Sequence, residues 1–129
     1  MGRKIGNYLA GHAFEYLTKK GSFSIEKKLI MRPFFEKMNI DDKTRHRNKM
    51  IEDCQYAIFL FGKSSSSSDI VINSQGVMEE YKIAKQLKKN IISIPTTGYA
   101  AKQIFNEQKN NIVEYPYLEN YINQLEHEN

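Results

Sequence analysis

The stretch NSQGVMEEYKIAKQLKKNIISIP, residues 73–95, places an amphipathic helix directly before a short apolar run. Its apolar positions recur at helical spacing and form one stripe, made of Val77, Tyr81, Ala84 and Leu87. We therefore expect a helix from Gly76 to about Lys89, with this stripe facing the core and with Glu79, Lys82 and Gln86 facing water. The run NIISIP, closed by a proline, is typical of a buried strand.

Further elements alternate along the chain in the same way. A stripe that Gly21 ends predicts an amino-terminal helix; its members are Ile5, Leu9, His12, Tyr16 and Leu17. SIEKKLIMRPF, residues 24–34, and YAIFLFG, residues 56–62, are predicted strands, the second buried on both faces. The segment TTGYAAKQIFNEQ, residues 96–108, predicts another helix. Alternation of strands and helices predicts an α/β fold with a mainly parallel sheet and helices on both faces.

Two of the predicted helices carry inward-facing residues that define their orientation. A helix capped by Asp41 or Asp42 precedes YAIFLFG, and we expect its polar side to hold Arg45, Lys49 and Glu52. The predicted inward positions of this helix are Arg47, Met50, Ile51 and Cys54, and those of the helix in residues 96–108 are Ala101, Ile104 and Phe105.

Composition narrows the class of protein. With 129 residues and 40% hydrophobic content, the chain suits one domain over residues 1–129, and the serine run at residues 64–68 predicts a flexible loop. The net charge is +4, but the lysines are dispersed. They indicate either a solvated surface or attraction to phosphate-bearing ligands, and they do not predict a nucleic-acid partner.

The single cysteine and the lack of long apolar runs indicate a location. Cys54 has no partner for an internal disulfide, which fits a reducing compartment. No run reaches the roughly 20 apolar residues that cross a bilayer, and the amino terminus shows no signal-peptide core. We therefore expect a cytoplasmic protein without a membrane partner. The three histidines show no metal-ligand spacing, so no metal site is predicted, and His12 is expected to be a core residue.

Parallel sheets bind ligands beyond the carboxyl ends of their strands. Arg32 follows the first predicted strand, Gly62 and Lys63 follow the second, and Thr97, Gly98 and Tyr99 follow the third. The helix starts QGVMEE and TTGY also offer free backbone N–H groups, which are able to bind phosphate.

The adjacent acids Glu79 and Glu80 have two readings. Acidic residues near a helix start interact favourably with the helix dipole, by about 0.3 to 1 kcal/mol each, and this suffices for Glu79. We therefore expect that replacing Glu79 with alanine has little effect. Glu80 leans toward the core beside a strand end, where a carboxylate usually accepts a hydrogen bond, so it is also a candidate binding residue.

The runs HRNKMIEDCQYAIFLFGK and NSQGVMEEYKIAKQLKKNIISIPTTGYAAKQI together resemble the SLOG domains, relatives of the lonely-guy and Smf/DprA families. The resemblance is closest to the SLOG sensor domain of Thoeris antiphage effectors. It implies a Rossmann-like three-layer sandwich that binds cyclic ADP-ribose isomers made by partner TIR proteins. In that family, binding promotes assembly and activates an attached NAD-consuming domain.

The resemblance implies ligand-binding roles for Arg47, Lys63 and Glu80, which match family positions that hold phosphates and ribose hydroxyls. A guanidinium pairs with phosphate oxygens, an ammonium supplies a point charge and a carboxylate accepts from hydroxyls. An alternative for Arg47 is a structural role, with its stem on the core and its head paired to Asp53 or Glu36. MGRKIGNY resembles the family's glycine-rich turn into its first helix, with Lys4 in place of a glycine. The full predicted set is Arg47, Lys63, Glu80, Arg32, Asn73, Gly76, Thr97, Gly98, Tyr99 and Gly6.

The sequence departs from the family pattern at its amino terminus. A full SLOG domain begins with two more strands, and neither precedes Gly2. In the strand order 3-2-1-4-5-6 these lie in the middle of the sheet, so we expect a reduced sheet with unpaired edges. Unpaired edges and exposed apolar surface predict an oligomer, with a homodimer as the simplest form.

Three functions remain open at this stage. The protein could sequester a nucleotide signal, as a phage-encoded sponge would, or it could dock on a full-length SLOG effector and regulate its assembly. A phosphoribohydrolase like the lonely-guy enzymes is the weakest reading, because SQGVMEEY lacks that family's second glycine and its threonine. We therefore expect a binding protein without catalytic residues or a cofactor.

Overall fold

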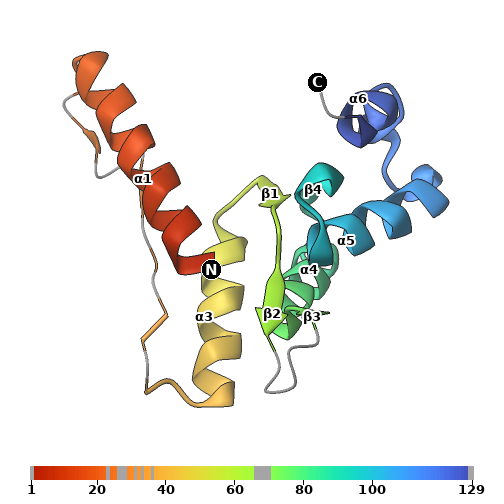
Figure 1. Cartoon of the computed structure of the whole chain (residues 1–129). Helices are drawn as coiled ribbons and strands as arrows, with labels where there is room; N and C mark the ends of the chain where they lie inside the picture. Colours follow the sequence, from red (N-terminus) through yellow and green to blue (C-terminus); the bar gives the residue numbers. More distant parts are fainter. Residues whose placement is uncertain are drawn as a thin grey trace. The chain divides into compact units, whose positions relative to one another are not determined.

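A computed structural model describes residues 2–22, 24–25, 29–30, 32, 34–35, 37–65 and 71–127 (Figure 1). The chain divides into two compact units, Met1–Met38 and Asn39–Asn129. The expectation of a single domain over residues 1–129 stays a prediction. Among the described residues, no helix combines the length and hydrophobicity that crossing a bilayer requires.

The first unit is built around helix α1, Gly2–Lys19. Gly21, at φ 66°, follows the helix and ends it as predicted, because glycine adopts this left-handed conformation without steric cost. The glycine-rich turn predicted around Gly6 is wrong, since the helix runs through this residue and a Cβ there would meet nothing within 4 Å. His12 is exposed rather than buried and lies 3.8 Å from the Glu15 carboxylate.

The strand predicted at residues 24–34 is wrong for the part that the structure describes. Ile25 is helical, and its carbonyl accepts a hydrogen bond from the Leu29 N–H at 2.8 Å. Ile30, Arg32 and Phe34 are irregular. Short apolar runs do not distinguish strand from helix by their pattern. Residues 26–28, 31 and 33 lie outside the described residues.

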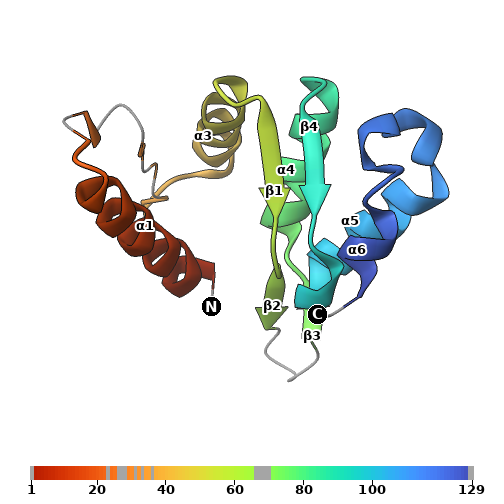
Figure 2. The ribbon, with the colours of Figure 1, turned by 90° about the horizontal axis from the view of Figure 1, so that it is seen from above.

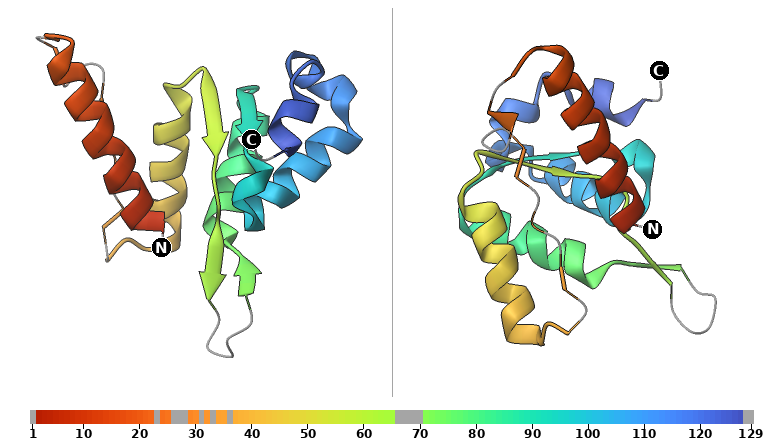
Figure 3. Two further views of the ribbon diagram at one scale, coloured as in Figure 1. Left: turned by 45° about the horizontal axis from the view of Figure 1, so that its top comes forward. Right: turned by 90° about the vertical axis from the view of Figure 1, so that its left-hand side faces the viewer.

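The second unit contains a parallel strand pair and an antiparallel hairpin. Strands β1, Tyr56–Phe59, and β4, Asn90–Ser93, are parallel, with Ala57 opposite Ile91. Strands β2, Lys63–Ser65, and β3, Val71–Asn73, are antiparallel, with Lys63 opposite Asn73. This hairpin projects beyond the carboxyl end of β1 (Figure 3). Ser64 and Ser65 therefore belong to a strand, and residues 66–68 of the predicted flexible loop lie outside the described residues.

Three helices surround the parallel pair: α3, Ile40–Glu52; α4, Gln75–Gln86; and α5, Tyr99–Asn110. The cap of α3 is Asn39, whose side chain accepts from the Asp42 N–H, so the predicted cap at Asp41 or Asp42 is displaced. A short 3-10 helix η1, Pro95–Thr97, leads from β4 into α5. Helix α4 lies along one face of the β1–β4 pair (Figure 2).

Helix α4 ends earlier than its predicted limit at Lys89. Lys88 is left-handed at φ 52°, and the Lys89 N–H donates to the Ala84 carbonyl at 2.9 Å, which closes the helix end. Leu87 therefore lies past the last helical residue and is 38% exposed, although its spacing predicted a core position. Ile83, at 5% exposure, faces the core in its place.

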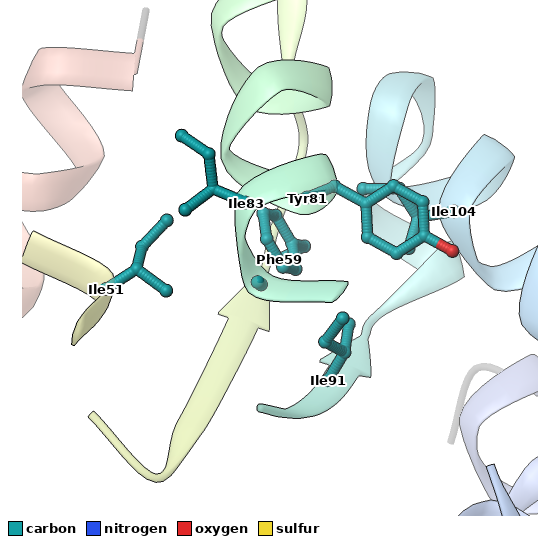
Figure 4. Close-up of a cluster of buried hydrophobic side chains, with 7 residues drawn as sticks. Ile51, Phe59, Tyr81, Ile83, Ile91 and Ile104 are labelled. Atoms are coloured by element: carbon teal, nitrogen blue, oxygen red, sulfur yellow. The ribbon is translucent and has the colours of Figure 1, made fainter. Parts of the chain in front are cut away.

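The main core lies between α4 and the inner face of the strands (Figure 4). It brings together Ile51, Phe59, Tyr81, Ile83, Ala84, Ile91 and Ile104, which come from five elements. Ala101, Ile104 and Phe105 are buried as predicted. Cys54 was predicted to face inward but is exposed. Helix α3 ends at Glu52, so the helical spacing that predicted an inward position does not extend to Cys54.

A second core cluster covers the opposite face of β4. Neighbouring residues of a strand point to opposite faces, and Ile92 packs against the second cluster while Ile91 packs in the main core. The cluster comes from α5 and from three elements that the sequence analysis did not assign: η2, Ile112–Glu114; η3, Pro116–Leu118; and α6, Ile122–Glu126. Its buried members are Phe105, Tyr115, Leu118 and Ile122.

Strand β1 is covered on one face only, contrary to the prediction. Phe59 is buried, but Tyr56 and Ile58 are 57% and 62% exposed. The apolar run YAIFLFG correctly predicted a strand, but such a run is compatible with a strand covered on one face as well as with one covered on both. The result is a mixed α/β Rossmann-like fold in which the second helical layer reaches β4.

The outer edge of β4 is closed by side chains. The Tyr117 hydroxyl accepts from the Ile91 N–H at 2.7 Å and lies 3.0 Å from the Ile91 carbonyl oxygen, to which it donates. The buried Gln108 amide donates to the same oxygen at 2.9 Å. These bonds take the place of a neighbouring strand, so the edge presents no free backbone groups at Ile91.

Candidate functional site

Two loops meet at the carboxyl ends of β1 and β4, and both have unusual backbone conformations. Phe61 and Gly62, after β1, have φ of 59° and 84°, and Gly98 and Tyr99, after η1, have φ of 75° and 56°. A non-glycine residue in this region costs on the order of 1–3 kcal/mol, and such residues cluster at functional sites. The two loops therefore store strain at the edge where a parallel sheet binds ligands.

Hydrogen bonds join these loops to each other. The Phe61 N–H donates to the Thr97 hydroxyl at 2.8 Å, and the Ala101 N–H donates to the Phe61 carbonyl at 3.0 Å. Gly62 fits where no other residue would, because a Cβ there would lie 2.5 Å from the Ala100 Cβ. Its carbonyl accepts from the Ser74 N–H at 2.7 Å, so the loop after β1 also positions the start of α4.

Lys63 and Tyr99 come together above this junction. The Lys63 ammonium lies 5.6 Å from the centre of the Tyr99 ring, within the range of a cation–π contact. Asn73, opposite Lys63 in the hairpin, donates from its amide to the Gln103 side-chain oxygen at 2.5 Å. A cation and an aromatic ring next to one another suit a ligand with a phosphate and a flat base.

Arg47 lies between α3 and α4 and pairs with both adjacent glutamates. Its side chain is only 12% exposed; Nη1 is 2.9 Å from Glu79 Oε2, and Nε is 3.5 Å from Glu80 Oε1. The Glu79 carboxylate also accepts from the Thr44 hydroxyl at 2.5 Å. A Cβ at Gly76 would lie 2.8 Å from Arg47 Nη2, so the absence of a side chain at Gly76 leaves room for the guanidinium.

The two glutamates differ in their surroundings. The Glu80 side chain is 22% exposed, and burial raises the pKa of its carboxyl above the ordinary value, although Arg47 opposes this shift. The Glu79 side chain is 37% exposed. The helix-dipole reading of Glu79 is wrong in its premise, because α4 starts at Gln75 and Glu79 lies beyond the first turn. Glu79 is an ion-pair partner of Arg47.

The structure thus gathers most of the predicted residues at one end of the parallel strands. Arg47, Gly76 and Glu80 form one cluster, which we call the arginine cluster together with Glu79 and Thr44. The remaining predicted residues of the second unit lie on the adjoining loops and hairpin: Lys63, Asn73, Thr97, Gly98 and Tyr99. Arg32 and Gly6 belong to the first unit. Ligand binding by these residues stays a prediction.

Glu79 and Gln103 contact predicted site residues, and Thr44 contacts Glu79, but none of the three was predicted from the sequence as part of the site. Thr44 lies one helical turn before Arg47, so helical spacing gave a signal for it. Glu79 and Gln103 gave none, because their roles depend on contacts between distant elements. Among the described residues, no group of three or more histidine, cysteine, aspartate or glutamate side chains is placed to hold a metal ion.

Comparison with known proteins places this chain in a family. The model of the "Sir2- and TIR-associating SLOG family" matches residues 1–129. The chain is 26% identical over 107 residues to the NAD(+) hydrolase ThsA of Bacillus cereus, covering 82% of this chain and 22% of that protein.

Two further relatives carry the same name. The chain is 27% identical over 121 residues to the NAD(+) hydrolase ThsA of Cytobacillus dafuensis, covering 88% of this chain and 24% of that protein. It is 26% identical over 114 residues to the one from Enterococcus faecium, covering 88% and 23%. The chain therefore spans less than a quarter of the length of each of these relatives. The family match over all 129 residues shows that the chain belongs to the Sir2- and TIR-associating SLOG family.

Proposed function

We propose that this protein binds a cyclic ADP-ribose-type signalling nucleotide without converting it, and that it withholds the nucleotide from a Thoeris-like effector. The observation that carries the proposal is the gathering of Arg47, Lys63 and Glu80 at the carboxyl ends of β1 and β4. Membership of a SLOG family and similarity to ThsA proteins support a nucleotide ligand. Such a protein would act in the cytoplasm, that of the host if a phage encodes it.

Each proposed contact follows from the chemistry of the site. Lys63 would pair with a phosphate, and the Tyr99 ring beside it would stack on a base or cover a ribose. Glu80 would accept hydrogen bonds from ribose hydroxyls, and Arg47 would bind the second phosphate. The first backbone N–H groups of α4, next to Gly76, would add donors for the same anion.

The proposal separates a binding protein from an enzyme in one experiment. Calorimetry with a panel of ADP-ribose isomers measures affinity, and chromatography of the ligand released by denaturation shows its chemical state. Release of the intact isomer supports sequestration or sensing. An altered product would show catalysis, and lack of binding to every isomer would contradict the proposed function.

A second candidate function is docking on a full-length SLOG effector, and the open edge of β1 favours it. The carbonyls of Gln55 and Phe59 accept from the Asn90 and Ile94 N–H groups, so the backbone groups of Ile58 point to the opposite edge. No strand within the described residues pairs with that edge. Exposed strand edges recruit strands from other chains.

The same edge would serve a homodimer, which is the oligomer that we propose for the isolated protein. Light scattering at micromolar concentration should then give twice the mass of the chain, and Ile58→Lys should shift the protein to a monomer without unfolding it. A stable wild-type monomer would contradict the homodimer. A complex that forms only after a SLOG effector is added would favour docking.

A further inference from the structure

The arginine cluster contains more negative than positive charge. One guanidinium faces two carboxylates, at 2.9 Å for Glu79 and 3.5 Å for Glu80. If both carboxylates are ionised, the cluster carries one net negative charge. A phosphate that approached Arg47 in this state would meet a cation whose charge is already neutralised.

The position of Arg47 explains why it needs a counter-ion when no ligand is bound. Its head lies against the first turn of α4, since Nη2 would be 2.8 Å from a Cβ at Gly76. The amino end of a helix carries partial positive charge, so a buried cation there is unfavourable unless an anion accompanies it. Glu79 supplies this anion at the shorter of the two distances.

Glu79 is also the acid that can leave most easily. Its side chain is 37% exposed, against 22% for Glu80. The Glu79 carboxylate is therefore already partly hydrated, and rotation of the side chain into water changes its hydration less than it would for Glu80. Its carboxylate is kept on Arg47 by the Thr44 hydroxyl at 2.5 Å. Glu80 is more enclosed, and leaving its position would uncover more of its surroundings.

We propose that Glu79 is an internal counter-ion, which occupies Arg47 in the ligand-free protein and gives way to a phosphate of the bound nucleotide. This inference rests on the proposed function for the identity of the ligand. It makes Glu79 a residue that lowers affinity, and it assigns Thr44 the role of holding Glu79 in the competing position. Glu79 thereby favours ligands that present enough negative charge to replace it.

Calorimetry on Glu79→Gln tests this inference, with inorganic pyrophosphate and cyclic ADP-ribose isomers as probes. Glutamine retains the size of the side chain and an acceptor for Thr44 but removes the charge. We expect affinity for pyrophosphate to rise between about three- and tenfold, the range of a partly solvated ion pair. Thr44→Val should raise affinity less. Glu119→Gln, which removes an equal charge from an exposed residue, should change affinity less than about twofold.

A double-mutant cycle with Arg47→Met distinguishes a direct effect from a general one. Methionine keeps much of the apolar stem and removes the charge, and circular dichroism checks the fold. In this background Glu79→Gln should no longer raise affinity. The inference is wrong if Glu79→Gln binds pyrophosphate no tighter than wild type, or if its gain persists without Arg47. A gain for pyrophosphate that depends on Arg47, with no binding of cyclic ADP-ribose isomers, would leave the counter-ion standing and contradict the proposed function.

Discussion

The two ends of the parallel strands differ in how their polar side chains are paired. At the amino end, polar side chains pair with one another: Tyr81 and Tyr115 share a hydrogen bond between their hydroxyls at 3.1 Å, and Lys85 pairs with Glu107 at 2.7 Å. At the carboxyl end, Arg47 pairs with both Glu79 and Glu80. The exposed Lys63 lies beside the Tyr99 ring.

Backbone conformation separates the two ends as well. Among the described residues, the amino end has one left-handed residue, Lys88, which belongs to an ordinary helix end. The described part of the carboxyl end has four, and two of them, Phe61 and Tyr99, are bulky. Under the proposed function, the amino end stabilises the fold and the carboxyl end holds the ligand. Variants at the amino end should therefore change stability more than affinity, and variants at the carboxyl end should change affinity more than stability.

The largest expected effect comes from Tyr117→Phe at the amino end. The variant keeps the ring but leaves the Ile91 N–H without its acceptor, so the free energy of unfolding should fall by about 1 to 3 kcal/mol. Urea denaturation measures this loss. Tyr121→Phe, at a 54% exposed residue, is the matched control and should change stability by less than about 0.5 kcal/mol. A large loss of ligand affinity in folded Tyr117→Phe would contradict the division between the two ends.

A smaller effect, of opposite kind, is expected for Gly76→Ala at the carboxyl end. The new methyl group would push the Arg47 head from its position, and the end of a flexible side chain moves at little cost in stability. Affinity for the nucleotide should fall by about fivefold, or near 1 kcal/mol. Gly11→Ala, where a Cβ would meet nothing within 4 Å, should leave affinity unchanged. Equal affinities for the two variants in calorimetry would show that Arg47 is not positioned by Gly76.

The smallest expected effect is a difference in pH dependence between the two ends. Burial raises the pKa of Glu80 from 4.5, so its contribution to stability is present below that value and is lost as pH rises through the folded pKa. Glu107 is the reverse: burial favours a higher pKa, but hydrogen bonds from Lys85 and Tyr81 outweigh it and lower the pKa from 4.5. Its contribution is present above 4.5 and is lost as pH falls through the folded pKa.

Urea denaturation at a series of pH values checks these signs. Glu80→Gln should abolish the fall in stability that ionisation of Glu80 causes as pH rises above 4.5. Glu107→Gln should abolish the rise in stability that ionisation of Glu107 causes as pH rises through the acid range. If the two variants change the pH profile in the same direction, the two ends do not differ as described.

Apolar runs and periodic stripes in the sequence predicted those helices and strands whose form depends on nearby residues. The apolar run in residues 91–94 and the periodic stripe of Ala101, Ile104 and Phe105 identified β4 and α5 correctly. YAIFLFG identified β1 but not its open face, because an apolar run does not show whether a second layer covers it. The strand predicted in residues 24–34 was wrong where it is described, because a short apolar run does not by its pattern specify a strand.

The site shows the same division between local and distant information. The carboxyl ends of predicted strands located Lys63, Thr97 and Tyr99, because the order of elements determines where those ends meet. The pairing of Glu79 with Arg47 joins residues on two helices, and the Tyr117 bonds to Ile91 span 26 positions in the chain. Neither follows from spacing, since both depend on how the elements pack.

The central claim is that the carboxyl end binds a nucleotide through its charged side chains, and calorimetry of Lys63→Ala with cyclic ADP-ribose isomers tests it most directly. Lys63 is exposed, so the variant should stay folded, with stability within about 0.5 kcal/mol of wild type. Affinity should fall by about tenfold, the effect of one lost charge-assisted contact to phosphate. Lys88→Ala removes the same charge at the amino end and should bind like wild type. Equal affinities for wild type and both variants, or no binding by wild type, would contradict the claim.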